Sequence, residues 1–272
     1  MATYAVGDLQ GCFHTFNSLL DKISFNTNSD ELWLVGDLIN RGLNSLEIIH
    51  WCYKNKKNIK LVLGNHDLHF LSVALSNRKV SRNDTFDGIL SSPYKRVFTD
   101  WLISIPLLHH NNKHIMTHAG LLPSWKTSQA IALAKSAADA LKKNPEYFLH
   151  SMYGNFPDRW ANSLGEDDIH RLTVNVLTRM RCLNSDESLD FSYKGTVKGM
   201  PENLKPWFSI PPHEKREVAL ITGHWSAVGF VKHASGYSLD SGCVWGKKLT
   251  ALCLENHEVY TVNADSRDLL QA

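Results

Sequence analysis

The sequence predicts an α/β fold whose functional residues stand at the ends of buried parallel strands. In the first quarter of the chain, three apolar runs each end in a glycine that is followed by a polar side chain; these runs span residues 3–7, 32–36 and 60–64. The segments between the runs have the apolar spacing of helices. The resulting β-α-β-α-β order predicts neighbouring parallel strands with right-handed crossovers, so the polar side chains should meet at one edge of the sheet.

The two segments between these strands are predicted to be amphipathic helices. The first is expected over residues 13–22, where apolar side chains recur every three or four positions. The second is expected to begin at Asn44 or Ser45, either of which is a suitable N-cap, with Glu47 in its first turn. These helices provide the crossovers that parallel strands require.

The rest of the chain contains further helices and strands and one long segment without the strand–glycine pattern. Helices are expected over residues 68–75, 94–105 and 128–142, and strands over residues 113–117, 218–222, 236–242, 248–254 and 258–262. Residues of about 125–217 are expected to form a mostly helical insertion that covers the site. No linker rich in Pro, Gly or Ser bounds this insertion, so we predict a single domain over residues 1–272.

Composition and charge exclude several classes of protein. Of the 272 residues, 43% are hydrophobic and 21% are charged, as expected of a packed globular protein. The net charge of +2 is too small to indicate a nucleic-acid or membrane surface, and no apolar run approaches the roughly 20 residues that span a bilayer. Five cysteines without a CxxC spacing, and no visible signal peptide, favour a reducing compartment. We expect a soluble cytoplasmic protein without a membrane partner, and its oligomeric state stays open.

Six residues at strand ends carry side chains that bind metal ions. They are Asp8, Gln10, Asp37, Asn65, His118 and His224. Oxygen and imidazole ligands suit manganese or cobalt, with iron or zinc as alternatives, better than calcium. Six ligands are too many for one tetrahedral site, so we expect two divalent ions roughly 4 Å apart with Asp37 as the bridging carboxylate. Such a pair lowers the pKa of a water molecule between the ions and makes it a nucleophile for attack on phosphorus.

Three residues beside these ligands are expected to act on the substrate. His66 follows Asn65 directly, and we expect it to protonate the leaving oxygen. Asp67 is expected to hold the imidazole of His66 in the required tautomer. Arg41 offers a bidentate guanidinium group to phosphate oxygens. The other histidines, including His69, lack this context, and we expect them to be surface or core residues.

The ordered motifs resemble those of the calcineurin-like metallophosphoesterases of the phosphoprotein-phosphatase branch. These motifs are Gly7-Asp8-Leu9-Gln10-Gly11, Gly36-Asp37-Leu38-Ile39-Asn40-Arg41-Gly42, Gly64-Asn65-His66-Asp67, His118-Ala119-Gly120 and Gly223-His224. Within this branch, the chain is similar to the bacterial symmetrical diadenosine tetraphosphatases, also through residues 152–154, 178–181, 205–208 and 239–246. The resemblance covers essentially the whole chain.

The resemblance implies a fold, an activity and two further site residues. The fold is a four-layer α-β-β-α sandwich with two mixed sheets. The activity is dinuclear-metal hydrolysis of diadenosine tetraphosphate into two ADP, and the same bond chemistry extends to nucleoside-tetraphosphate caps on RNA 5′ ends. Arg179 and Arg181 are implied to hold the polyphosphate, whereas the sequence alone is as consistent with a solvated helix face.

Two residues depart from the pattern of the branch and leave alternatives open. Gln10 stands where a histidine ligand is usual; it either binds a metal ion or points away and hydrogen-bonds the turn. Asn40 stands where protein phosphatases have Asp, which speaks against a protein serine/threonine phosphatase on the same scaffold. The second alternative, a non-catalytic nucleotide sensor, is suggested by Gln10 but disfavoured by the other retained ligands. Asp240 is expected either behind the ligands or in a turn.

Overall fold

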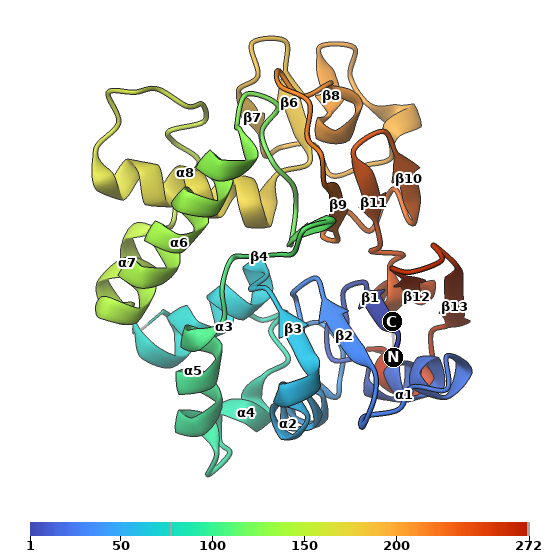
Figure 1. Cartoon of the computed structure of the whole chain (residues 1–272). Coiled ribbons are helices and arrows are strands. Elements are labelled where there is room, and N and C mark those ends of the chain that lie inside the picture. The colour runs from blue at the N-terminus through green and yellow to red at the C-terminus, as the bar shows by residue number, and fades with distance from the viewer. Residues whose placement is uncertain (77, 271–272) are drawn as a thin grey trace.

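Two five-stranded sheets form the centre of the structure, a computed structural model that describes residues 1–76 and 78–270 (Figure 1). The first sheet contains β1 (Thr3–Val6), β2 (Glu31–Leu34), β3 (Ile59–Leu61), β12 (Lys248–Cys253) and β13 (Val259–Asn263). The second contains β4 (Leu108–His110), β5 (His114–Thr117), β9 (Ala219–Thr222), β10 (Val231–His233) and β11 (Gly236–Ser238). A third sheet contains β6 (Cys182–Asn184), β7 (Leu189–Asp190) and β8 (Leu204–Pro206).

The strand order makes both large sheets mixed. In the first sheet the order is β13-β12-β1-β2-β3, with β1, β2 and β3 parallel and the pairs of β12 antiparallel. In the second sheet the order is β10-β11-β9-β5-β4, with β11, β9 and β5 parallel and the two edge strands antiparallel to their neighbours. The predicted β-α-β-α-β opening with parallel strands is confirmed.

Side chains that alternate along each strand pack in two separate hydrophobic layers. In β2, Leu32 and Leu34 belong to the larger core, whereas Trp33 belongs to the core between the two sheets. The inter-sheet core contains Ala5, Trp33, Val35, Val62, Met116, Ile221, Tyr237, Leu239, Leu252 and Leu254. Because both faces of these strands are buried, their sequences are continuous apolar runs. The predicted four-layer α-β-β-α sandwich is confirmed.

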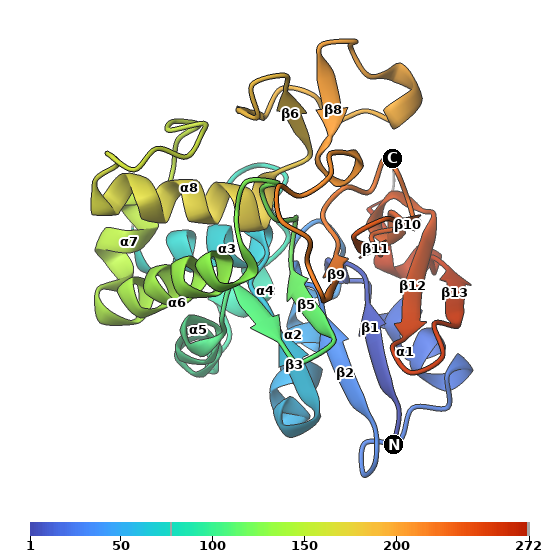
Figure 2. The ribbon, with the colours of Figure 1, turned by 45° about the horizontal axis from the view of Figure 1, so that its top comes forward.

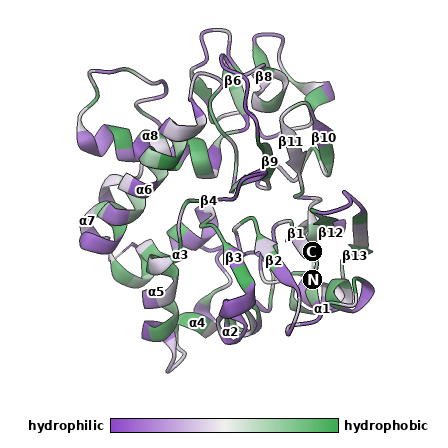
Figure 3. Ribbon diagram, viewed as in Figure 1, coloured by the Kyte–Doolittle hydropathy of each residue, from purple (hydrophilic) through white to green (hydrophobic). Residues whose placement is uncertain are grey.

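The helices lie on the outer sides of the sheets (Figure 1). They are α1 (Phe13–Lys22), α2 (Ser45–Lys54), α3 (Asn65–Leu75), α4 (Asp87–Leu90), α5 (Lys95–Ser104), α6 (Thr127–Lys143), α7 (Pro145–Ser151) and α8 (Glu166–Arg179). Figure 3 shows hydrophilic and hydrophobic residues mixed along α6 and α8, as expected of helices that bury one face. Across residues 1–76 and 78–270, none of the helices combines the length and the apolar composition that a membrane crossing needs.

The predicted helices are found within three residues of their expected boundaries, and one boundary affects the site. The helix expected from residue 68 begins at Asn65, so Asn65 lies in its first turn. At the start of α2, Asn44 is the N-cap residue, but its side chain accepts no hydrogen bond from the helix. Its amide instead donates to Asp268 Oδ1 at 2.9 Å.

The predicted insertion contains both helices and a small sheet. Helices α6, α7 and α8 pack on one another and against α3 and α5 (Figure 2). The single domain over residues 1–272 stays a prediction. The sequence pattern does not predict the third sheet, because its strands are only two or three residues long and too short to show a period.

Candidate metal centre and active site

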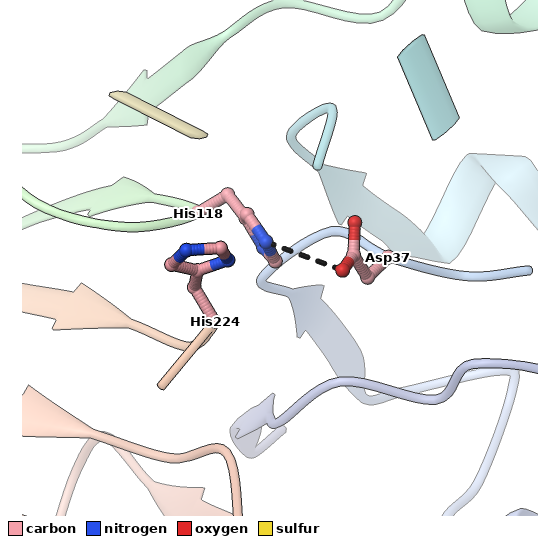
Figure 4. A group of neighbouring side chains, drawn as sticks. All are labelled: Asp37, His118 and His224. Carbon is pink, nitrogen blue, oxygen red and sulfur yellow. Dashed lines mark ion pairs between the residues drawn. The ribbon is translucent and has the colours of Figure 1, made fainter. Parts of the chain in front are cut away.

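The carboxyl ends of strands from both large sheets meet at one point. Asp37 follows β2, His118 follows β5, and His224 follows β9. Each offers one ligand atom, and these atoms lie within 4.8 Å of one another (Figure 4). His118 Nε2 is 3.4 Å from Asp37 Oδ2. The predicted convergence of these three residues is therefore confirmed.

Backbone carbonyls orient the two imidazole rings. Nδ1 of His118 lies 2.8 Å from the carbonyl oxygen of Val35, and Nε2 of His224 lies 3.1 Å from the carbonyl oxygen of Arg179. A carbonyl only accepts hydrogen bonds, so each of these nitrogens carries the proton. The opposite nitrogens, His118 Nε2 and His224 Nδ1, are therefore the ones that face a metal ion, which displaces the proton that His118 Nε2 otherwise shares with Asp37.

The atoms around the side-chain amide of Asn65 show that a cation fits between Asn65, His118 and His224. One of its two terminal atoms lies 2.9 Å from His224 Nδ1, 3.0 Å from the carbonyl oxygen of Thr178 and 3.2 Å from His118 Nε2. Without a cation, the amide nitrogen takes this position and donates its two hydrogens to His224 Nδ1 and the carbonyl oxygen of Thr178. His118 Nε2 is then protonated and pairs with Asp37. With the amide oxygen there, lone pairs from all four residues face one point, and only a cation satisfies them. The donor set therefore fits a divalent metal ion.

Asp8 and Gln10 lie on the loop after β1 and also face this centre. The backbone N–H of His224 donates to Asp8 Oδ1 at 3.1 Å. Nε2 of Gln10 donates to Asp37 Oδ2 at 3.2 Å, so the Gln10 side chain faces the site rather than pointing away from it. A Cβ atom on Gly64 would overlap Asp37 Oδ1, which explains why a glycine precedes Asn65.

Backbone strain is concentrated in these loops. Left-handed φ angles occur at Gln10 (42°), Asp37 (49°), Asn40 (81°), Arg41 (71°) and His224 (69°). Residues other than glycine adopt such angles at an energetic cost, and they persist where the surrounding structure enforces them. The φ angles thus mark the strand-end loops as a functional site independently of the motifs.

The pKa values of Asp8, Asp240 and His118 are raised, which indicates an excess of negative charge at the centre. Burial and the Asp240 carboxylate raise the pKa of Asp8 well above its usual range, and burial raises the pKa of Asp240 to about 6. Burial alone would lower the pKa of His118, but the carboxylates of Asp37 and Asp8 outweigh it and raise this pKa to about 10. The cluster therefore retains protons that a divalent ion would displace.

Three arginines lie near this centre. Arg41 and Arg179 line a cavity of about 380 Å³ together with His66 and Asn65. Arg179 also donates to Asn175 Oδ1. Arg181 is half-buried, and the carboxylates of Asp240, Asp37 and Asp8 act on its charge. Two of the three arginines therefore share one cavity with His66, and the third lies near the carboxylates of the centre.

Asp67 does not hold the imidazole of His66, and this prediction is wrong. Its carboxylate accepts hydrogen bonds from the backbone N–H groups of Asp37 (2.8 Å), Gly64 (2.9 Å) and Leu38 (3.0 Å). Asp67 is the third residue of α3, where an acidic side chain reaches back to the N-cap. Adjacent helical residues do not face each other, so Asp67 cannot reach the His66 ring. Its function is to tie the Asp37 loop to the start of α3.

Four further residues contribute to the site besides the predicted ligands. Asp240 lies beside Asp8, whose pKa its carboxylate raises, and its Oδ1 also accepts from the backbone N–H of Gly242 at 3.0 Å, so it is found both behind the ligands and in a turn. Asn40 contacts Nδ1 of His66 at 3.2 Å. His69 lies in α3, and its Nε2 is 3.0 Å from Oδ2 of Asp84, which lies in the loop before α4. His69 therefore takes part in the hydrogen bonds around the site. No motif marks Asp84, because it stands in a polar loop where acidic residues are common.

The sandwich of two mixed sheets with this donor set defines a class of metal-dependent phosphoesterases. A family model described as calcineurin-like phosphoesterase matches residues 1–251, and the chain belongs to that family. A solved structure described as a candidate diadenosine tetraphosphatase has the same fold, with a TM-score of 0.65, 20% identity, and coverage of 97% of this chain and 94% of that chain.

Relatives of known name narrow this assignment. The symmetrical bis(5′-nucleosyl)-tetraphosphatase of Methylobacillus flagellatus is 42% identical over 273 residues, which is 100% of this chain and 99% of the relative. The enzyme of the same name from Chromobacterium violaceum is 44% identical over 263 residues, covering 96% of this chain and 95% of the relative. The chain therefore belongs to the symmetrical bis(5′-nucleosyl)-tetraphosphatase family.

We expect Asp67→Asn to destabilise the fold. An amide cannot accept from all three backbone N–H groups, so the free energy of unfolding should fall by about 2–3 kcal/mol, measured by urea denaturation. Asp139→Asn is the matched control, since Asp139 is exposed and pairs with Lys135 on the surface of α6; it should cause no measurable change. An Asp67→Asn protein with unchanged stability and no catalysis would contradict the structural role.

Metal titrations of Gln10 variants should reveal whether this side chain is a ligand. Gln10→His replaces an amide by an imidazole and should lower the manganese concentration that gives half-maximal activity, because imidazole binds transition metals more tightly. Gln10→Ala should raise that concentration on the order of 10–100-fold. Calorimetric metal titration of both variants supplies a reading independent of turnover. Identical metal dependence in both would show that Gln10 is not a ligand.

Proposed function

We propose that this protein hydrolyses diadenosine tetraphosphate symmetrically, giving two molecules of ADP. The observation that carries the proposal is identity of 42–44% over nearly the whole chain to relatives that bear the name of this activity. The candidate centre supports it, because carboxylate, amide and imidazole donors meet where the strand ends converge. Asn40, in place of the acidic residue of protein phosphatases, speaks against a protein serine/threonine phosphatase.

The residues of the chain have distinct roles in this proposal. Arg41 and Arg179 bind phosphate oxygens in the cavity beside His66, and Arg181, which lies near the carboxylates of the centre, binds them as well. When bound, two divalent ions at the strand-end donors supply an activated water and offset the charge of the inner phosphates. His66 donates a proton to the oxygen of the departing ADP. Binding in this position selects an inner phosphorus and therefore symmetrical cleavage.

The metal ligands in this proposal are Asp8, Gln10, Asp37, Asn65, His118 and His224. We propose manganese or cobalt as the ions, with iron or zinc as alternatives, because the set combines hard oxygen donors with imidazole. Asp37 would be the bridging ligand, since it contacts both Gln10 and His118. The proposed role of each residue is open to substitution.

The proposal extends to a longer substrate and to a compartment. RNA 5′ ends that carry a nucleoside-tetraphosphate cap contain the same anhydride bonds and are the second substrate to test. All five cysteines are buried and unpaired in disulfides, which supports a reducing compartment. We propose the cytoplasm.

The products of hydrolysis distinguish the proposal from its alternatives. With diadenosine tetraphosphate and manganese, ADP should be the only nucleotide product on anion-exchange chromatography, because attack falls on an inner phosphorus. AMP and ATP in equal amounts would contradict symmetrical cleavage. Phosphate release from a phosphoserine peptide at a comparable rate would favour the protein phosphatase, and nucleotide binding without turnover would favour the sensor.

Two substitutions separate the metal ligand from the proton donor. Asp37→Asn keeps the shape of the side chain but removes the bridging charge, so turnover and bound metal should both be lost while the far-ultraviolet circular dichroism is unchanged. His66→Ala should lower kcat about 10²–10⁴-fold with metal content close to that of the wild type, measured by atomic emission. Loss of metal from His66→Ala would identify His66 as a ligand instead of an acid.

A further inference from the structure

A chain of hydrogen bonds leads from the His66 ring to a loop that no motif marks. Nδ2 of Asn40 lies 3.2 Å from His66 Nδ1 and donates to Asp84 Oδ1 at 2.9 Å. Asn40 and Asp84 are both buried. Asn40 comes from the loop after β2, and Asp84 precedes α4. Two loops that are more than forty residues apart therefore meet behind the proposed proton donor.

The orientation of the Asn40 amide is determined by its other contacts. Oδ1 of Asn40 accepts hydrogen bonds from the backbone N–H groups of Arg41 at 2.8 Å and Thr85 at 3.1 Å. The end that faces Asp84 and His66 is therefore the NH₂ group, which can only donate. His66 Nδ1 must accept, and in a neutral ring the single proton is then on Nε2. Nε2 lies on the side of the metal ligands, 3.9 Å from Asp37 Oδ2.

Asp84 is the anchor of this arrangement. Its Oδ2 accepts from the backbone N–H of Ser81 at 2.7 Å and lies 3.0 Å from Nε2 of His69. Burial would raise the pKa of Asp84, but the hydrogen bonds from Asn40, Ser81 and His69 outweigh it and lower this pKa. Arg41 Nη1, 3.5 Å from Oδ1, adds positive charge. The carboxylate is therefore ionised and holds the Asn40 amide in its donating orientation.

We propose that Asp84, acting through Asn40, fixes His66 in the Nε2–H tautomer and aims that proton at the leaving oxygen. Asp84 and Asn40 are thus positioning residues, and their assignment rests on the proposed function, since it concerns the step in which ADP departs. In that step, the oxygen of water bonds to phosphorus and the bond from phosphorus to the bridging oxygen breaks. The Nε2 proton moves to that bridging oxygen; the attacking water gives up one proton to solvent, and solvent restores the proton on Nε2.

The tautomer can be observed without turnover. Long-range ¹H–¹⁵N correlation spectra of the magnesium-loaded protein, labelled with ¹⁵N-histidine, should show His66 with Nε2 protonated and Nδ1 unprotonated; comparison with His66→Ala assigns the signal. In Asn40→Leu, which removes the donor at similar size, the signature should change to a mixture of tautomers. A wild-type ring protonated on Nδ1 alone would overturn the proposal even if ADP is the product.

Kinetics then test whether the two residues act through His66. Asn40→Leu and Asp84→Ala should each lower kcat about 10–100-fold, while metal content stays within twofold of the wild type. KM should stay within twofold in Asn40→Leu, whereas Asp84→Ala also frees Arg41 and is compared by kcat alone. In the His66→Ala background, neither change should lower kcat further, because residues that act through one group are not additive. Multiplicative losses in that background would overturn the proposal.

A matched control excludes a general effect of disturbing a buried carboxylate. Asp268 is also buried, and it accepts hydrogen bonds from the backbone N–H groups of His14 and Thr15. Asp268→Asn should reduce stability but leave kcat and the His66 tautomer unchanged. Should Asn40→Leu fail to fold, Asp84→Ala and the wild-type spectrum still decide the question. A wild-type protein that produces no ADP but shows the Nε2–H tautomer would refute the proposed function alone.

Discussion

The carboxylate of Asp37 is the contact on which the other parts of the site depend. It accepts a hydrogen bond from the backbone N–H of His66 at 2.8 Å, receives the amide of Gln10, and pairs with His118. Burial alone would raise the pKa of Asp37, but His118 and His66 hold it below its usual range. One anion thus connects loops that follow β1, β2 and β5 with the start of α3. Removing one partner from such a buried network leaves the opposite charge without compensation, so the loss of Asp37 would affect every group that pairs with it.

The sequence predicts the parts of this site that obey local rules. A strand, a glycine and a ligand recur in order, and parallel strands bring their carboxyl ends together, so Asp37, His118 and His224 could be placed from spacing alone. The apolar runs predict the parallel strands, whereas the four-layer arrangement is implied by the resemblance of the motifs. The small third sheet could not be predicted, because two or three residues define no period.

Contacts between loops that are distant in the sequence cannot be predicted from the spacing of the motifs. Asp67 is adjacent to His66 in sequence but turned away from it by the geometry of α3, whereas Asn40 and Asp84 reach the ring from elsewhere. Which carboxylate meets which donor depends on loop conformations, several of which are left-handed at residues other than glycine. Such angles reflect enforcement by the surroundings rather than local preference. The sequence therefore shows that Asn40 departs from the motif of the protein phosphatases, but only the structure shows that its partner is Asp84.

The C-terminal end of α8, which belongs to the predicted insertion, contributes backbone groups to the candidate metal centre. Its last turn presents consecutive backbone carbonyls to the centre: Leu177 accepts from the backbone N–H beside His118, Thr178 faces Asn65, and Arg179 faces His224. These are carbonyls that a helix leaves without partners of its own, and they carry the negative end of its dipole. A helix terminus of this polarity favours cations. The segment that lines the cavity beside His66 therefore also contributes to the electrostatics of the candidate metal centre.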